Sequence, residues 1–328
     1  MILQISKINT CKNLLAFSAG VDSSALFFLL LNNNIPFDIA IVNYNMREQS
    51  KEEVAYAQSL AQKYNKNIYL KEVILENNSN FEKKARDIRY SFFEEIIEEY
   101  SYETLITAHQ LNDKLEWFLM QFSKGAGLPE LISFEEFKKK ENYTICRPLI
   151  NISKNDLLKY LDQNNIQYFL DKSNFDEKYR RNYFRKNYAN KFIEEFEDGI
   201  KKSFEYLQKD VKSLNANIEA FFVKKELEIY NLHNDDNINI RIIDKSLKKR
   251  GFLLSKAQRD EIIKQKECVI SHKISVNLSS NYIFIAPYVE ANMNKKFKEK
   301  CRLYKLPKNI RPYIFKEDFL NEICNTLN

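Results

Sequence analysis

Short apolar runs alternate with longer stretches of helical periodicity over the first 124 residues of the chain. The apolar runs predict four β-strands, at residues 13–17, 38–44, 67–73 and 103–108. Apolar residues at spacings of three and four predict helices at residues 23–31, 50–64, 81–100 and 111–122. This alternation predicts an α/β fold, a Rossmann-like parallel sheet with helices on both faces. Such sheets bind ligands beyond the carboxyl ends of their strands, so functional residues are expected directly after the strands.

The pattern changes near residue 190. Residues 191–225 show helical spacing, and residues 226–328 contain two helical stretches followed by alternating segments near 276–278 and 282–287. We therefore expect a catalytic domain over residues 1–190. A linking helix and a smaller, mainly helical C-terminal region should follow over residues 191–328.

The charge of the chain is unevenly distributed between these two parts. The 328 residues include 51 Lys and Arg against 45 Asp and Glu, a net charge of +6. Residues 1–200 hold 26 basic and 29 acidic residues (net −3), whereas residues 201–328 hold 25 and 16 (net +9). A basic C-terminal part on a slightly acidic body suits a polyanion-binding region, although a solvated Lys-rich face accounts for the charge equally well.

Composition excludes several classes of protein. The longest uninterrupted apolar run, residues 25–31, is too short to span a membrane, and residues 1–13 lack the apolar core of a signal peptide. The five cysteines are scattered without a C-x-x-C pair, which argues against structural zinc and cysteine-bound iron–sulfur clusters. Free thiols in a reducing compartment are expected, so the sequence predicts a cytoplasmic protein.

The first strand leads into the loop Ser18-Ala19-Gly20-Val21-Asp22-Ser23, and a helix follows. Small residues between a strand and a helix N-terminus predict an anion site, because backbone N–H groups and the helix dipole face the ligand. An acidic residue in such a loop suits Mg²⁺, so Asp22 is the candidate metal ligand. The loop matches neither the P-loop nor the dinucleotide motif, and an ordinary capped turn is the alternative.

This loop resembles the S-G-G-x-D-S loop of the N-type ATP pyrophosphatases, which split ATP between its α and β phosphates. The resemblance implies that Ser18, Ala19, Gly20, Val21, Asp22 and Ser23 bind ATP. Ala19 stands where the family has glycine. The extra methyl group is tolerable at a negative φ and costly at a positive one.

Further segments over residues 11–190 resemble, in order, the motifs of the tRNA(Ile)-lysidine synthetase family. They are N-Y-N-M-R at 43–47, N-F-E-x-x-A-R-x-x-R-Y-x-F-F at 80–93, T-A-H-Q-L-N-D-x-x-E at 107–116, G-x-G-L at 125–128, R-P-L at 147–149, D-x-S-N at 171–174 and R-N-x-x-R at 181–185. Tyr44 and Gln110 each replace a histidine of the family pattern.

Pairs of charged residues at helical spacing are the candidate catalytic groups. Asp113 and Glu116 lie three apart just beyond a strand, which suits an ammonium group or Mg²⁺, whereas the alternative is a solvated acidic face. Arg86 and Arg89 are likewise three apart. They suit a phosphate or an adenylated base, and salt bridges to nearby glutamates are the alternative.

His109, Arg181 and Arg185 complete the set of candidates. His109 is a candidate for phosphate contact or proton transfer, and a packed or capping histidine is the alternative. Arg181 and Arg185 lie in a segment rich in Asn and Tyr, which favours contact with an RNA backbone over a plain surface position.

The resemblance implies an ATP-dependent ligase acting on isoleucine tRNA with a CAU anticodon. ATP would adenylate the wobble cytidine with Mg²⁺ as cofactor, and free lysine would displace AMP to form lysidine, changing decoding from AUG to AUA. The expected partners are this tRNA, L-lysine and, as an oligomeric state that the sequence allows, a second copy of the chain. The alternatives are a tRNA thiolase on the same fold and a non-catalytic RNA-binding relative.

Overall fold

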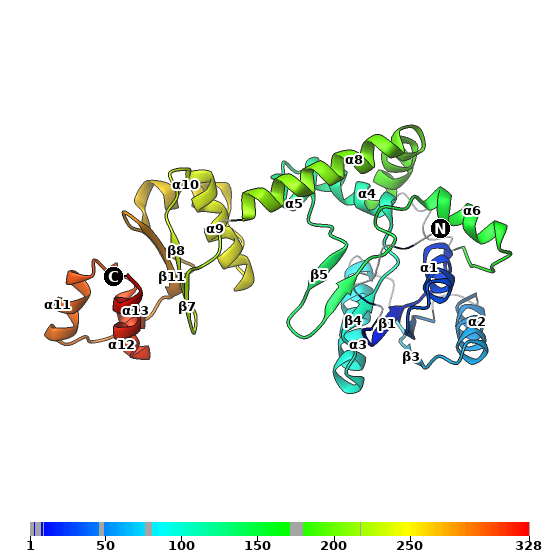
Figure 1. The fold of residues 1–328 in the computed structure, drawn as a ribbon, viewed down its shortest axis with the longest axis horizontal. Coiled ribbons are helices and arrows are strands. Elements are labelled where there is room, and N and C mark those ends of the chain that lie inside the picture. The colour runs from blue at the N-terminus through cyan, green and yellow to red at the C-terminus, as the bar shows by residue number, and fades with distance from the viewer. Residues whose placement is uncertain are drawn as a thin grey trace. The chain divides into compact units, whose positions relative to one another are not determined.

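The computed structural model divides the chain into two compact units, Met1–Gln208 and Lys209–Asn328, each described by itself (Figure 1). It describes residues 3, 8, 10–45, 49–75, 81–170, 180–216 and 218–327. Among these residues, no helix has the length and hydropathy required to cross a membrane.

The first unit is built on a six-stranded sheet with the strand order β3-β2-β1-β4-β6-β5. All neighbouring strands are parallel except β5, which pairs antiparallel with β6 at the edge. The strands are β1 (Asn13–Ala16), β2 (Asp38–Asn43), β3 (Ile68–Glu72), β4 (Thr104–Ile106), β5 (Phe137–Lys139) and β6 (Thr144–Cys146).

The helices of this unit follow the strands along the chain. They are α1 (Val21–Asn32), α2 (Gln49–Lys63), α3 (Phe81–Tyr100), α4 (Leu111–Phe122), α5 (Leu128–Leu131), α6 (Lys154–Gln163), α7 (Arg180–Phe184), the π-helical turn η3 (Arg185–Ala189) and α8 (Asn190–Asn215). The four strands and four helices predicted before residue 124 are thus confirmed, with ends that differ by at most a few residues.

Two hydrophobic cores, one on each face, hold this sheet between its helices. Successive strand residues point to opposite faces, so Leu15 joins a core with α1, α2 and α6, whereas Leu14 joins a core with α3. Leu105 and Ile106 of β4 divide in the same way. The predicted Rossmann-like sheet with helices on both faces is therefore confirmed. The carboxyl ends of β1 and β4 are neighbours, because these two strands pair directly.

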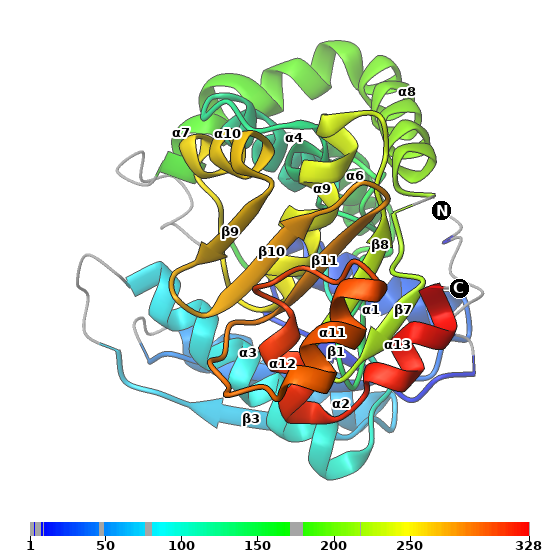
Figure 2. The same cartoon turned by 90° about the vertical axis from the view of Figure 1, so that its left-hand side faces the viewer.

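The second unit contains an antiparallel sheet with the order β7-β8-β11-β10-β9. Its strands are β7 (Phe222–Lys224), β8 (Leu227–Asn231), β9 (Glu267–Ile270), β10 (Ile274–Leu278) and β11 (Tyr282–Pro287). Its helices are α9 (Asp236–Lys249), α10 (Lys256–Gln265), α11 (Lys295–Leu303), α12 (Arg311–Glu317) and α13 (Leu320–Leu327). Helices α9 and α10 pack on the opposite face of the sheet from α11–α13 (Figure 2).

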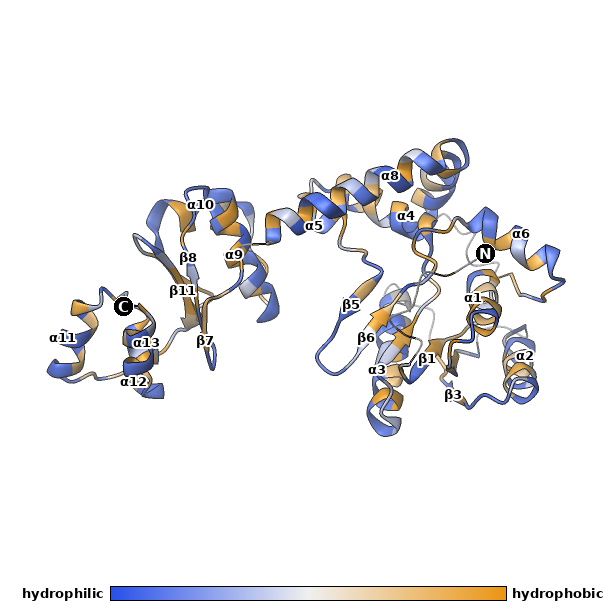
Figure 3. Cartoon of the chain, viewed as in Figure 1, coloured by the Kyte–Doolittle hydropathy of each residue, from blue (hydrophilic) through white to orange (hydrophobic). Residues whose placement is uncertain are grey.

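The helices of the C-terminal region agree with the predicted fold class, and the two alternating segments are β10 and β11. The sequence did not indicate β8, because the strand is only five residues long and has a glutamate at a position that is buried. Its Glu228 accepts hydrogen bonds from Tyr230, Ser246 and Arg250, which lets a carboxylate lie inside the strand. Helix α8 extends across the division between the units, and its hydropathy alternates along its length, as expected of a helix buried along one side (Figure 3).

Candidate active site

The loop between β1 and α1 is closed on itself by serine side chains. The backbone N–H of Ser18 donates to Ser23 Oγ at 3.2 Å, the two hydroxyl oxygens are 3.1 Å apart, and Ser23 Oγ donates to the Gly20 carbonyl at 3.3 Å. Gly20 is the N-cap of α1 and provides no side-chain acceptor for the first backbone N–H groups of the helix. The loop therefore presents the positive end of a helix dipole beyond the carboxyl end of β1, which is the geometry of an anion site.

Ala19 adopts the left-handed conformation, with φ at 57°. The residue is fully buried, and its carbonyl accepts a hydrogen bond of 2.9 Å from the N–H of Phe169. A non-glycine residue in this region costs about 1 kcal/mol or more. Alanine replaces the family glycine without strain only at a negative φ, and the φ of Ala19 is positive. The contacts with the segment ending at Phe169 hold the loop in this conformation.

Asp22 lies in the first turn of α1, and its carboxylate faces the interior of the site. The buried Oδ1 atom has no hydrogen-bond donor among the described residues. Burial raises the pKa of Asp22 to about 6, although the nearby Lys154 ammonium opposes this effect. An ionised carboxylate in this position is costly unless a cation joins it, so Asp22 fits the predicted role of a Mg²⁺ ligand.

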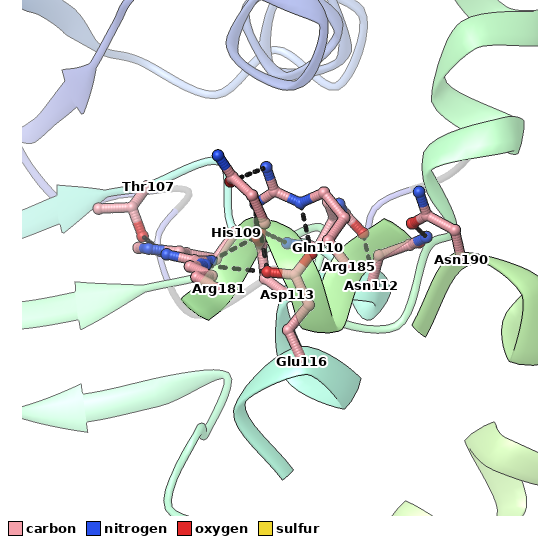
Figure 4. A network of polar contacts seen from close by, with 10 residues as sticks. Thr107, His109, Gln110, Asn112, Asp113, Glu116, Arg181, Arg185 and Asn190 are labelled. Carbon is pink, nitrogen blue, oxygen red and sulfur yellow. Dashed lines mark hydrogen bonds and ion pairs between the residues drawn. The ribbon is translucent and has the colours of Figure 1, made fainter. Parts of the chain in front are cut away.

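Four charged side chains form a compact cluster beside this loop (Figure 4). Arg181 donates to Asp113 Oδ1 at 2.5 Å through Nη2 and to Glu116 Oε2 at 2.8 Å through Nε. Arg185 donates to Glu116 Oε1 at 2.6 Å through Nε and to Oε2 at 3.2 Å through Nη2. We call Asp113, Glu116, Arg181 and Arg185 the charge quartet.

The two carboxylates of the quartet are buried and face the two guanidinium groups. The side chain of Glu116 is 0% exposed and that of Asp113 is 11% exposed. Burial is the largest single effect and would raise the pKa of Asp113, but the charges of Arg181 and Arg185 and the backbone N–H of Gln110 together outweigh it, so the pKa lies below the usual value. Burial would likewise lower the pKa of Arg181, but Asp113 and Glu116 together raise it. The alternative of a solvated acidic face is excluded.

Helix geometry explains how both arginines reach the same two carboxylates. Asp113 and Glu116 share one face of α4, and positions 181 and 185 are four apart on the chain. Arg185 is the first residue of the π-helical turn η3, a wide turn that is rare and often occurs at functional sites. Sequence analysis assigned these arginines to tRNA and these carboxylates to lysine or Mg²⁺, whereas the structure brings all four together.

Gln110, which replaces a histidine of the family, caps helix α4. Its Oε1 accepts a hydrogen bond of 2.5 Å from the N–H of Asn112, and its own N–H donates to Asp113 Oδ2 at 3.1 Å. The side chain of Asn112 in turn accepts from the N–H of Lys154 and donates to Asn190 Oδ1. This network orients Asp113 and ties the start of α4 to α6 and α8.

His109 lies between the quartet and an aromatic ring. Its Nδ1 is 2.9 Å from Thr107 Oγ1, and its ring meets the ring of Phe134 edge-on at a centroid distance of 5.1 Å. Burial lowers the pKa of His109 to about 3, against the opposing charge of Asp113. The imidazole is therefore neutral at physiological pH, so it can form hydrogen bonds to a phosphate or a base but contributes no positive charge.

The two arginines of α3 differ in their surroundings. Arg86 is exposed, and its guanidinium lies 4.6 Å from the ring centroid of Tyr90. Arg89 is half-buried and close enough to Tyr44 to oppose the effect of burial, which raises the pKa of that phenol. Tyr44, the other histidine replacement, donates to the carbonyl of Ala85 at 2.7 Å and so joins the end of β2 to α3.

Two cations near the site, Lys154 and Arg147, were not among the residues predicted from the sequence. Lys154 lies at the N-terminus of α6, and its positive charge acts to lower the pKa of Asp22. In the sequence, only its position directly after the capping Ser153 indicated a function. Arg147, quoted only as part of a motif, is buried with its guanidinium 4.9 Å from the Phe134 ring. The motif residues at 46–47, 80 and 171–174 lie outside the described residues.

The quartet predicts strong energetic coupling between Glu116 and Arg185. Removing one member of a buried ion pair leaves the other charge uncompensated, so Glu116→Gln should lower the free energy of unfolding by about 3 kcal/mol. A double-mutant cycle with Arg185→Gln, measured by urea denaturation, should give a coupling energy of about 1–3 kcal/mol. The exposed pair Lys71 and Glu95, 3.0 Å apart, is the matched control and should couple by less than about 1 kcal/mol. Equal coupling in both pairs would contradict this account of the site.

The raised pKa of Asp22 predicts a pH-dependent stability. Its folded-state pKa of about 6 exceeds the usual value of 3.8, so the fold loses stability as the pH rises from about 4 to about 6, and the loss levels off above that range. Between pH 5 and pH 7, wild type should therefore lose about 1 kcal/mol of unfolding free energy relative to Asp22→Asn. Asp87→Asn, which removes an exposed carboxylate of α3, is the control. A difference that is constant with pH would show that Asp22 is not perturbed.

Comparisons with known proteins identify the family of this chain. Residues 2–192 match the family described as the PP-loop domain. The chain is 44% identical to a tRNA(Ile)-lysidine synthase of Campylobacter jejuni (strain RM1221), over 93% of this chain and 92% of that protein. It is 41% identical to a tRNA(Ile)-lysidine synthase of Helicobacter pylori (strain ATCC 700392 / 26695), over 96% and 95% of the two chains.

Among solved structures, the chain resembles the U34-tRNA thiolase NcsA from Methanococcus maripaludis with its [4Fe-4S] cluster. The TM-score is 0.51 at 15% identity, over 62% of this chain and 72% of that chain, which shows a shared fold. The identity to curated relatives along nearly their whole length carries more information. Together with the PP-loop match, it shows that the chain belongs to the tRNA(Ile)-lysidine synthase family.

Proposed function

We propose that this protein joins free L-lysine to the wobble cytidine of isoleucine tRNA with a CAU anticodon, in the cytoplasm. ATP adenylates the 2-carbonyl oxygen of the cytidine with release of pyrophosphate, and the ε-amine of lysine then displaces AMP. A ring carbonyl oxygen is a poor leaving group until it carries a phosphate ester, so activation must precede substitution. The product, lysidine, changes decoding from AUG to AUA.

The observation that carries this proposal is the agreement between relatives and geometry at one place. The chain matches curated tRNA(Ile)-lysidine synthases over more than nine-tenths of its length. The carboxyl ends of β1 and β4 bring together a loop that leads into a helix N-terminus, the buried Asp22 Oδ1 without a donor among the described residues, and the charge quartet.

The loop residues from Ser18 to Ser23 are proposed to bind the phosphates of ATP. Their hydroxyl and backbone N–H groups are donors at a helix N-terminus. Mg²⁺ would be held by Asp22, since the described residues contain no cluster of three or more metal-binding side chains and Mg²⁺ is commonly bound by one or two carboxylates together with substrate phosphates. When bound, the ion would neutralise charge on the pyrophosphate leaving group.

Asp113 and Glu116 are proposed to bind the ammonium of lysine, in exchange for part of their contact with Arg181. The side chain of Arg181 is 39% exposed, whereas that of Arg185 is 19% exposed, so Arg181 is the arginine that a substrate can displace more easily. His109 is proposed to form a hydrogen bond to a phosphate or the base as a neutral imidazole. Arg86 and Arg89 are proposed to position the adenylated base.

The proposed tRNA contact of the C-terminal part is concentrated in one segment. Residues 295–316 contain nine basic residues and one acidic residue, a net charge of +8, which accounts for most of the +9 found after residue 200. Lys295, Lys296 and Lys298 of α11 are all exposed. Such a surface suits phosphate groups, and its binding should weaken as salt rises. The proposal also extends to a homodimer, which sedimentation of the purified protein would detect.

The alternative of a tRNA thiolase is disfavoured by the cysteines. Cys146, Cys301 and Cys324 are buried. Burial raises the pKa of Cys146 to about 12 and that of Cys301 to about 11, which disfavours the thiolate that sulfur chemistry requires.

The reaction predicts lysine transfer that depends on Asp22. Purified protein incubated with ATP, Mg²⁺, labelled lysine and a CAU-anticodon isoleucine tRNA transcript should incorporate label into the RNA. Asp22→Ala should abolish AMP formation, because the pyrophosphate is left without its charge compensation. Asp87→Asn should remain active, and a characterised relative assayed in parallel is the positive control. If wild type incorporates no lysine while that control does, the proposed function is wrong.

If the basic segment contacts tRNA phosphates, replacing its lysines should weaken tRNA binding and reduce the dependence of that binding on salt. Changing Lys295, Lys296 and Lys298 to glutamine should raise the Kd for tRNA. The slope of log K against log salt should fall by up to about 1 for each phosphate that is no longer neutralised. A second triple variant, Lys256, Lys264 and Lys273 to glutamine, removes the same charge from other exposed positions of this unit. Equal effects of the two variants would contradict a localised tRNA surface.

A further inference from the structure

The segment that carries Arg181 and Arg185 also contains exposed cations and aromatic rings that are not part of the charge quartet. Residues 180–191 contain five basic residues and no acidic residue, although the first 200 residues as a whole have a net charge of −3. Arg181 and Arg185 are turned toward Asp113 and Glu116. The remaining cations, Arg180, Lys186 and Lys191, are exposed.

Three aromatic rings gather among these cations. Tyr183, Phe184 and Tyr188 form a mutual cluster with centroid distances of 6.0, 5.8 and 5.6 Å between the three pairs. Tyr183 is 42% exposed and Tyr188 is 47% exposed, so both rings present surface to solvent. We call Tyr183, Phe184 and Tyr188 the ring cluster.

Arg180 borders the ring cluster and is held in place. Its guanidinium lies 5.7 Å from the centroid of the Phe184 ring, and its Nη2 donates to Ser123 Oγ at 3.1 Å. The hydroxyl oxygens of Tyr183 and Tyr188 are 3.4 Å apart, which links the two exposed rings to each other. The surface is therefore an ordered set of rings with a cation at its edge, anchored to the end of α4 by Ser123.

We infer that the ring cluster is a stacking platform for an unpaired nucleotide of the tRNA anticodon loop, next to the target cytidine. The inference rests on the proposed function. Aromatic faces interleaved with cations bind single-stranded RNA, because bases stack on the rings while phosphates meet the positive charges. A protein partner would need only the apolar surface, whereas the three exposed cations of a segment without an acidic residue favour a polyanion.

The platform changes the assignment of tRNA contacts within this segment. Arg181 and Arg185 pair with the carboxylates of α4, and the exposed rings beside them receive the RNA. Because the rings and these arginines belong to one short helical stretch, a nucleotide stacked on the ring cluster would lie within about a turn of the quartet. Docking of the anticodon loop would then place its wobble base near the proposed reaction centre.

The test compares leucine and phenylalanine variants of the two exposed rings. Tyr183→Leu/Tyr188→Leu removes the aromatic faces, whereas Tyr183→Phe/Tyr188→Phe retains them. Tyr206→Leu removes an exposed ring from α8 and is the matched control. The probe is an anticodon stem-loop RNA with a CAU anticodon and 2-aminopurine beside the wobble cytidine, whose fluorescence is quenched when the base stacks.

Wild type, the phenylalanine variant and Tyr206→Leu should bind the probe with quenching. The leucine variant should bind about ten-fold more weakly or worse and lose the quenching. The KM of the leucine variant for tRNA should rise. Its kcat at saturating tRNA and its affinity for ATP should stay near the wild-type values. Thermal unfolding of all variants checks that the fold is intact.

Two failures are distinguishable. If wild type transfers lysine but the leucine variant binds and quenches the probe as wild type does, the platform is wrong and the proposed function stands. If wild type transfers no lysine but quenching still depends on the two rings, the platform stands as an RNA-binding surface and the proposed function falls.

Discussion

The ion pairs between Arg181, Arg185, Asp113 and Glu116 are the interaction on which the arrangement of the site depends. The side chain of Glu116 is fully buried, and a carboxylate in that position needs the positive charges that face it. The partners are 65 to 69 residues apart in the sequence, so the cluster forms only when the helical segment α7–η3 packs on α4. The contacts that pack α7–η3 on α4 are therefore also the contacts that form the site, and they include Arg185 of the π-helical turn.

The site contains buried carboxylates of two kinds. Asp113 has its charge balanced by arginine, and its pKa lies below the usual value. Asp22 has a pKa raised to about 6 and a buried oxygen that no described residue satisfies. The site therefore combines two carboxylates whose charge is balanced by arginines with one carboxylate that has a buried oxygen without a donor among the described residues. Groups whose environments push their pKa values in opposite directions are characteristic of functional sites, because each state suits a different task.

The sequence predicted the candidate site residues but not which of them pair with one another. Strand–helix alternation gave the sheet, and the rule that ligands bind beyond strand ends led to the loop at residues 18–23 and to Asp113 and Glu116. Spacing along one helix identifies side chains that share a face, but it contains no information about contacts between helices far apart in the chain. The arginine partners of Asp113 were therefore assigned to RNA. The sequence likewise did not indicate the positive φ of Ala19 or the strand β8 with its buried Glu228, because tertiary contacts determine both.

The departures from the family motifs are explained by structure rather than by loss of activity. Gln110 caps α4 and orients Asp113, Tyr44 joins β2 to α3, and Ala19 keeps the loop conformation at a cost in backbone strain. A chain that needed only the fold would be more stable with a neutral residue at position 22, because an unbalanced buried carboxylate opposes folding. It would also have no need for a left-handed alanine in a loop that ends at a helix N-terminus. Both features lower stability, so the fold alone does not explain them, which argues against a non-catalytic relative.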